Sequence, residues 1–195
     1  MTVAPDTVQV GGRRLKPARL MILACSQRKR PDPGRIPAID RYDGPMWQTL
    51  RTIDHDGANA QVAVLSARFG LRDARWTSLP DYDTAMTDAI ADAMIRGGIV
   101  TRWPRPSSAR IPDSIGIHPA CELASMANAA GAAFRDIALV GGHRYIHVLE
   151  SWLPSFTAAG WVTPAARIVI VNGPIGRMRQ RFRAWLEEGA PCSSI

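Results

Sequence analysis

Four short segments of the chain are continuously apolar, whereas the segments between them are apolar only at helical spacing. The continuous runs are residues 20–25, 62–67, 137–141 and 168–172. A continuous run, in contrast to an alternating one, is typical of a strand buried on both faces, as in a parallel sheet covered by helices. The pattern therefore predicts an α/β fold with a central, mostly parallel sheet.

Helical spacing and cap residues predict four helices between and after these strands. They cover residues 85–94, 119–131, 143–158 and about 177–188. Asp83 is the expected N-cap of the first helix, and Gly97-Gly98 its stop. Pro119 suits the first position of the second helix. Pro154 is expected to break or kink the third.

The length of the chain predicts a single domain. Its 195 residues suit one α/β domain over residues 19–190, after a flexible N-terminal arm over residues 1–18. With 46% hydrophobic and 21% charged residues, the composition is globular rather than that of a disordered polycation. The sequence holds no apolar run of the roughly 20 residues that span a bilayer and no signal-peptide segment. We therefore expect a cytoplasmic protein without a membrane partner.

The charge of the chain points to an anionic partner. The formal net charge is +7, and all but two of the 24 basic residues are arginine. Arginine presents a planar fork to phosphates and base edges, so nucleic acid or a nucleotide is the expected partner. A GC-rich genome, which raises arginine and alanine together, is the alternative. The basic, proline-rich segment 99–119 is either an arm along a phosphate backbone, with Trp103 stacked on a base, or a surface loop.

Cysteine and histidine spacing argues against a metal or disulfide framework. The three cysteines are an odd number without a Cys-x-x-Cys pair. His143 and His147 are one helical turn apart, but no Glu follows the first, as a zincin motif requires. We expect neither a metal site nor a cofactor.

Small or polar residues followed by cations come after each predicted strand. Ligands of parallel sheets bind beyond the carboxyl ends of the strands, where small residues let backbone N–H groups approach an anion. The sequence predicts a phosphate or nucleotide site there, although Gly and Ser also end strands that bind nothing. The predicted nucleic-acid- or phosphate-binding residues are Ser26, Lys29, Tyr42, Ser66, Arg68, Gly142, Arg144, Tyr145, Gly173, Gly176 and Arg177.

The last of these loops is the sharpest single motif. A Gly-x-x-Gly turn, Gly173 to Gly176, leads into a helix that carries Arg177. Such a turn exposes backbone N–H groups at a helix start, where the macrodipole favours phosphate. It is not a Walker loop, because no Lys-Ser/Thr pair follows it.

The candidate catalytic residues are Cys25, Asp43, Tyr82 and Asp83. Nearby cations would favour the nucleophilic thiolate of Cys25, and an aspartate in a pocket could act as general base. The alternatives are structural, because a cysteine at a strand end is often a small buried hydrophobe and aspartate is common in turns and caps.

Four segments together resemble the YaaA-like proteins and their shorter relatives. They are Cys25-Ser26-x-x-Lys29, Asp40-Arg41-Tyr42-Asp43-Gly44, Leu65-Ser66-Ala67-Arg68-Phe69-Gly70-Leu71 and Tyr82-Asp83. The resemblance covers roughly residues 19–90. It implies a link to peroxide stress and binding of duplex DNA in a positively charged cleft, lined here by Lys29, Ser66, Arg68 and Tyr82.

Three functions remain open. The preferred one is binding of nucleic acid, with DNA as the expected form. The second is an enzyme acting on a nucleobase, nucleoside or nucleotide, for example by N-glycosidic cleavage, base exchange or DNA base modification, with Tyr42 or Tyr82 stacked on the base. That enzyme would need an enclosed pocket and a carboxyl group of raised pKa. The third is a redox function of Cys25.

Overall fold

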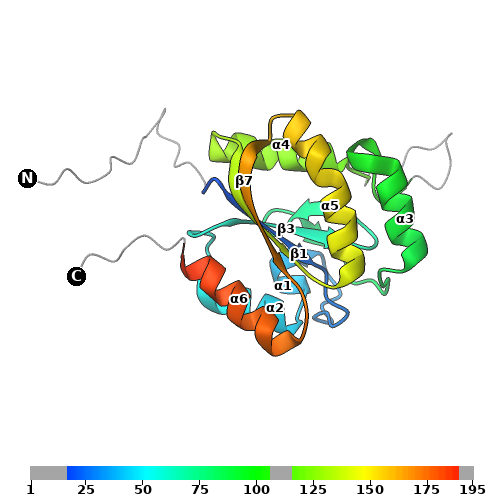
Figure 1. Cartoon of the computed structure of the whole chain (residues 1–195). Coiled ribbons are helices and arrows are strands. Elements are labelled where there is room, and N and C mark those ends of the chain that lie inside the picture. Colours follow the sequence, from blue (N-terminus) through cyan, green and yellow to red (C-terminus); the bar gives the residue numbers. More distant parts are fainter. Residues whose placement is uncertain (1–16, 106–115, 189–195) are drawn as a thin grey trace, which may run out of the picture.

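A computed structural model describes residues 17–105 and 116–188, which fold around one five-stranded sheet (Figure 1). The strands lie in the order β4-β3-β1-β6-β7. All neighbours are parallel except β3 and β4, which are antiparallel. The predicted α/β fold with a mostly parallel sheet is confirmed. The strands are β1 (Arg19–Ala24), β3 (Gln61–Ser66), β4 (Gly70–Asp73), β6 (Phe134–Val140) and β7 (Val162–Val171).

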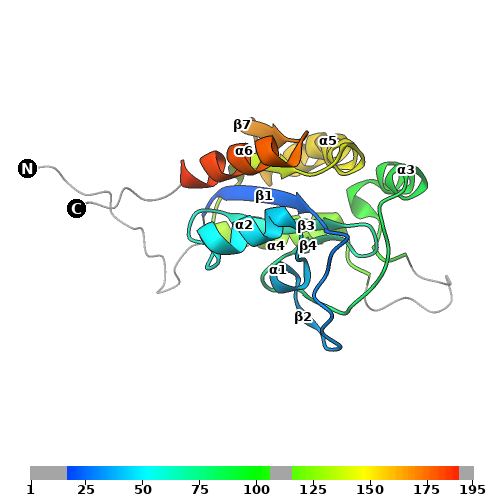
Figure 2. The same ribbon diagram turned by 90° about the horizontal axis from the view of Figure 1, so that it is seen from below.

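Helices cover both faces of the sheet (Figure 2). On one face lie α3 (Asp88–Gly97), the short 3-10 helix η1 (Gly98–Val100), α4 (Pro119–Ala130) and α5 (His143–Ala158). On the other lie α1 (Ala38–Arg41), α2 (Pro45–Asp54) and α6 (Ile175–Glu187). Two short strands, β2 (Ile36–Pro37) and β5 (Ser78–Leu79), pair with each other outside the main sheet.

The central strand β1 divides the core into two halves. Leu20 and Ile22 pack into the half under α3, α4 and α5, whereas Met21 and Leu23 pack into the half under α2 and α6. All four are at most 1% exposed, and full burial of such a side chain stabilises the fold by about 1.5–3 kcal/mol. This two-sided burial explains why the strand reads as one continuous apolar run.

Polar groups tie the start of β1 to its neighbours. Arg19 lies opposite Asp136 of β6, and its Nε donates to the Asp136 carboxylate at 2.8 Å. The indole Nε1 of Trp185 on α6 donates to the other oxygen of that carboxylate at 3.0 Å. The Arg19 guanidinium lies 4.0 Å from the Trp185 ring. Two strands and one helix are thereby joined at one end of the sheet.

The structure confirms some of the predicted helix ends and corrects others. Helix α4 begins at Pro119 and ends at Gly131, whose φ of 66° is the left-handed conformation that glycine adopts readily. Helix α5 runs through Pro154 without a break, because its buried face holds it against the sheet. Asp83 as N-cap was wrong: α3 begins at Asp88, and its cap is Thr87, whose hydroxyl accepts from the Ile90 N–H at 3.2 Å.

Two regions of the sequence lie partly outside the described residues. Residues 1–16 of the predicted arm and residues 106–115 of the proline-rich segment belong to them, so their predicted roles stay predictions. Trp103, at 7% exposure, packs in the core, which leaves no room for a base to stack on it. Within the two described ranges, no helix is both long and apolar enough to cross a membrane.

Candidate functional site

The four loops that carry the predicted site meet at one edge of the sheet, named here the carboxyl edge. Ala24 pairs with Leu65, Leu23 with Val140, and Val140 with Val171, so the parallel strands end level with one another. Strand β3 ends at Ser66, and the first residues beyond β1, β6 and β7 are Cys25, Gly141 and Asn172. The Cys25 N–H bonds to the Leu65 carbonyl at 3.0 Å, and the Gly141 N–H to the Val171 carbonyl at 3.1 Å. The carboxyl edge lies at the lower end of β7 in Figure 1.

Three hydroxyl groups form a buried chain under the carboxyl edge. The Ser66 Oγ lies 2.8 Å from the Tyr82 hydroxyl, which lies 2.6 Å from the Tyr42 hydroxyl. Ser66 also accepts hydrogen bonds from the backbone N–H groups of Arg68 and Phe69. These two donors occupy both lone pairs of the Ser66 oxygen, so Ser66 must donate to Tyr82, and Tyr82 to Tyr42. The chain fixes the loop after β3.

Burial of Tyr42 and Tyr82 changes the role predicted for them. Tyr42 is 0% and Tyr82 7% exposed, and their rings meet edge to face. Neither ring is open to a stacked base or a phosphate, so both predictions are corrected: the two tyrosines support the loops from beneath. Burial raises the pKa of each phenol far above its usual value, so both are neutral and cannot serve as bases near pH 7.

Cys25 is half-buried and bonded to another predicted site residue. Its Sγ lies 3.1 Å from the hydroxyl of Tyr145 on α5, which joins the end of β1 to the first turn of that helix. Burial raises the pKa of the Tyr145 phenol most, and the nearby Cys25 raises it further. Cys25 also lines a cavity of about 120 Å³ beside the start of α2. Pockets for small-molecule ligands usually measure about 300–1,000 Å³, so this cavity does not accommodate a nucleoside.

Neither predicted catalytic aspartate is positioned as a general base. The Asp43 carboxylate is bound by Arg51 at 2.7 Å and by Arg28 at 3.2 Å. Arg51 also donates to the Ile39 and Tyr42 carbonyls, so this group ties α2 to the loop before it. Asp83 is exposed on the extended segment before α3. The structure therefore gives Asp43 a loop-stabilising role and leaves the Asp83 side chain exposed.

Cations remain at the carboxyl edge without an acidic partner. The Lys29 ammonium lies 4.4 Å above the centre of the Tyr82 ring, and the exposed Arg68 guanidinium 5.5 Å from that of Phe69. Arg177 is exposed in the first turn of α6. None of these three forms an ion pair with a carboxylate in the described part of the chain. Arg144 differs, because its exposed guanidinium binds Asp88 at 2.5 Å.

Three helices begin at this edge without a side-chain cap. The N-caps of α2, α5 and α6 are Gly44, Gly142 and Pro174, and none of them makes a side-chain cap hydrogen bond. A β-carbon added at Gly142, Gly173 or Gly176 would meet nothing within 4 Å, so the backbone there is open to an approaching group. Helix starts of this kind carry partial positive charge.

Sequence reasoning missed Arg41, which shapes the loop after β1. Its side chain is fully buried and makes five hydrogen bonds to backbone carbonyls. The acceptors are the carbonyls of Arg30, Asp32, Gly34 and Leu79. Arg41 thereby holds the basic segment 28–35 in one conformation. Arg41 belongs to one of the four segments that resemble the YaaA-like proteins, but its residue type gave no sign that its side chain is buried.

Comparisons with known proteins add no family or activity. The chain matches no protein-family model, no curated protein and no solved structure. The resemblance to YaaA-like proteins therefore stays a prediction, carried by the four sequence segments.

Proposed function

We propose that the carboxyl edge binds the phosphate backbone of a nucleic acid, with DNA as the expected partner. The observation that carries this proposal is the convergence of four loops at an edge that presents Lys29, Arg68 and Arg177. These cations lack ion-pair partners among the described residues, and three uncapped helix starts surround them. Together they form an electropositive surface, and the cavity beside Cys25 at this edge measures only about 120 Å³, which suits a polyanion on the surface better than an enclosed small ligand.

Two features favour a binding surface over the enzyme considered above. The cavity beside Cys25 is small, about 120 Å³, and the aspartates of this region are paired with arginine or exposed. Glu122 is a carboxyl group whose pKa is raised by burial, but it accepts from the Asp73 N–H beside α4 rather than facing the carboxyl edge. The resemblance to YaaA-like proteins points in the same direction, since it implies binding of duplex DNA.

The proposal is tested by measuring the salt dependence of duplex binding. Fluorescence anisotropy of a labelled duplex gives the affinity of the protein from low to moderate salt. The double variant Lys29→Ala/Arg68→Ala removes two expected phosphate contacts, so the slope of log K against log salt should flatten by about 1.8, from about 0.9 per contact. A mononucleotide competitor distinguishes binding of a phosphate backbone from binding of a free nucleotide.

The matched control is Arg135→Ala. Arg135 is an exposed arginine on β6, at the amino edge of the sheet, and its removal changes the net charge without touching the carboxyl edge. Its slope should equal that of the unchanged protein. The absence of duplex binding, or a salt slope that Arg135→Ala flattens by about 0.9, half the change expected of the double variant, overturns the proposal.

A further inference from the structure

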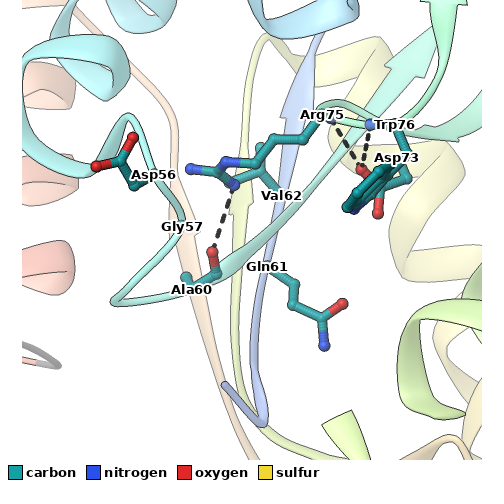
Figure 3. A pocket seen from close by; sticks show the side chains of 8 residues that line it. All are labelled: Asp56, Gly57, Ala60, Gln61, Val62, Asp73, Arg75 and Trp76. Atoms are coloured by element: carbon teal, nitrogen blue, oxygen red, sulfur yellow. Dashed lines mark hydrogen bonds between the residues drawn. The ribbon is translucent and has the colours of Figure 1, made fainter. Parts of the chain in front are cut away.

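The two edge strands of the sheet are protected to different extents. Strand β4 is four residues long, and short edge strands resist pairing with other chains. The Asp73 N–H at its end donates to the Glu122 carboxylate of α4 at 2.6 Å. In the turn that follows, the Asp73 carboxylate accepts from the N–H groups of Arg75 and Trp76 (Figure 3). The Arg75 side chain reaches the Ala60 carbonyl before β3. The end of the β4 edge is therefore bonded within the chain.

Strand β7, at the opposite edge, is ten residues long (Figure 1). From Arg167 to Val171 it pairs with β6 residue by residue. The Val171 carbonyl accepts from the Gly141 N–H, so Val171 faces β6. Successive residues of a strand turn their backbone groups to opposite sides, so the N–H and carbonyl groups of Ile168 and Ile170 face outward. No strand within the two described ranges lies on that side.

The features that protect an edge are confined to the first part of β7. Pro164 has no N–H, and the register against β6 shifts before Arg167. Arg167 is the one charged residue of β7. Its guanidinium is bound by Glu188 at 2.6 Å and lies 3.7 Å from Asp136, so its charge is neutralised. Residues 168–171 are isoleucine and valine only, without the charge or proline that commonly guards an edge strand.

An apolar groove lies beside this edge, between α5 and β7. It has a volume of about 650 Å³. Ile168 lines it, and Ile170 shares the same face of the strand; they are 38% and 40% exposed. Val169 points the other way and packs toward α6. An occupant of this edge must therefore supply an extended backbone and apolar side chains. The lining residues are Glu150, Leu153, Pro154, Thr157, Ala158, Val162, Thr163, Pro164, Ala166 and Ile168.

We propose that a second copy of this chain binds here, so that two β7 strands pair antiparallel across a two-fold axis at Val169. This axis pairs the regular stretch 167–171 with itself. Ile168 of each copy then exchanges backbone hydrogen bonds with Ile170 of the other copy. Their side chains meet on the α5 side of the sheet, where such cross-strand pairs add to stability. The two sheets become one continuous sheet of ten strands.

Charge and backbone chemistry favour this occupant and this register. An axis at Val169 places Arg167 opposite Val171 of the other copy, whereas an axis at Arg167 would place two arginines opposite each other. Pro164 then lies beyond the paired stretch, so its missing N–H does no harm. Glu150 is the one charged residue of the groove lining, and Arg167 is already bound by acids, so the net charge of +7 is not concentrated at this edge.

Sedimentation equilibrium of the full chain over a range of concentrations tests the proposal. Ile170→Lys places a charge at the apolar contact of each copy, and the matched control is Val100→Lys, at a position 70% exposed on η1. Circular dichroism checks that both variants fold. The unchanged protein and the control should form dimers. Ile170→Lys should raise the dissociation constant at least about tenfold, because two isoleucines per dimer lose their burial.

Hydrogen exchange of the unchanged protein locates the interface without any substitution. The outward amides of Ile168 and Ile170 should become protected as the concentration rises, whereas those of Val169 and Val171, which face β6, should be protected at every concentration. A chain that stays monomeric up to millimolar concentration overturns the proposal. So does a dimer that folded Ile170→Lys does not weaken, or one in which the amides of Ile168 and Ile170 exchange as fast as in the monomer.

Discussion

The buried Arg41 provides the sharpest test of how the basic loop is held. We consider the substitution Arg41→Met, which keeps an unbranched side chain but removes all five hydrogen bonds to the carbonyls of the loop and of Leu79. Because the guanidinium is fully buried, its donors bind the chain and not water. The loop that carries Arg28, Lys29 and Arg30 should lose its fixed conformation.

The magnitude follows from the four carbonyls that lose a donor. A net loss of about 1 kcal/mol for each gives about 4 kcal/mol. Arg30, Asp32 and Gly34 are exposed residues whose carbonyls can turn to water, whereas Leu79 is 1% exposed and cannot compensate. We therefore expect a loss of about 3 kcal/mol in the free energy of unfolding. With an m-value of about 2 kcal/mol/M, the urea midpoint should fall by about 1.5 M.

Urea unfolding followed by circular dichroism measures this loss, and hydrogen exchange locates it. The amides of Arg30 and Asp43, which bond to the Arg41 and Arg28 carbonyls, should exchange faster in the variant. If Arg41→Met does not fold, Arg41→Lys keeps the charge and part of the donor set and should lose about half as much stability. A free energy of unfolding that stays within about 0.5 kcal/mol of that of the unchanged protein in both variants would refute the reasoning.

Three further outcomes follow from the structure. Burial raises the folded-state pKa of Tyr42 and Tyr82, so below about pH 10 both phenols are protonated in the folded and the unfolded chain and their contribution to stability does not change with pH. Above about pH 10 only the unfolded chain loses these protons. The free energy of unfolding should then fall by about 1.4 kcal/mol per pH unit for each tyrosine. Tyr42→Phe should flatten this alkaline decline in urea midpoints measured between about pH 10 and pH 11. Gly141→Val should lower the melting temperature by about 4–8 °C, because an added β-carbon would lie 2.6 Å from that of Ala24, whereas Gly142→Ala, in open space, should change it little.

The sequence was sufficient to predict the four parallel strands of the sheet and the edge that carries the candidate site. Strand β1 is buried on both faces, so its apolar run could be recognised without any tertiary information. Once the strands are parallel, their carboxyl ends must lie at one edge, so the meeting of the loops at Ser66 and Gly142 followed from chain order alone. Edge strand β4 was missed, because four residues are too few to give a periodic signal.

The roles of individual polar side chains could not be predicted in the same way. Tyr42 and Tyr82 are separated by 40 residues, and only the fold shows that their hydroxyls bond each other instead of facing a ligand. Asp83 was an acceptable N-cap by residue type, but the segment around Tyr82 stays extended to bring that ring into the core, so the helix begins later at Thr87. Such outcomes depend on tertiary packing, which overrides local preference.

The two-sided core of β1 has a consequence for how the domain avoids misfolding. Both faces of β1 are equally apolar. A register shift of one residue would therefore turn Leu20 and Ile22 to the face now held by Met21 and Leu23, with little change in the hydrophobic free energy. The correct alignment must therefore be selected at the strand's two ends, where Arg19 finds Asp136 and Cys25 finds Tyr145. A strand shifted in register would leave Asp136 and Tyr145 without these partners, so the two polar contacts favour the correct register of the sheet.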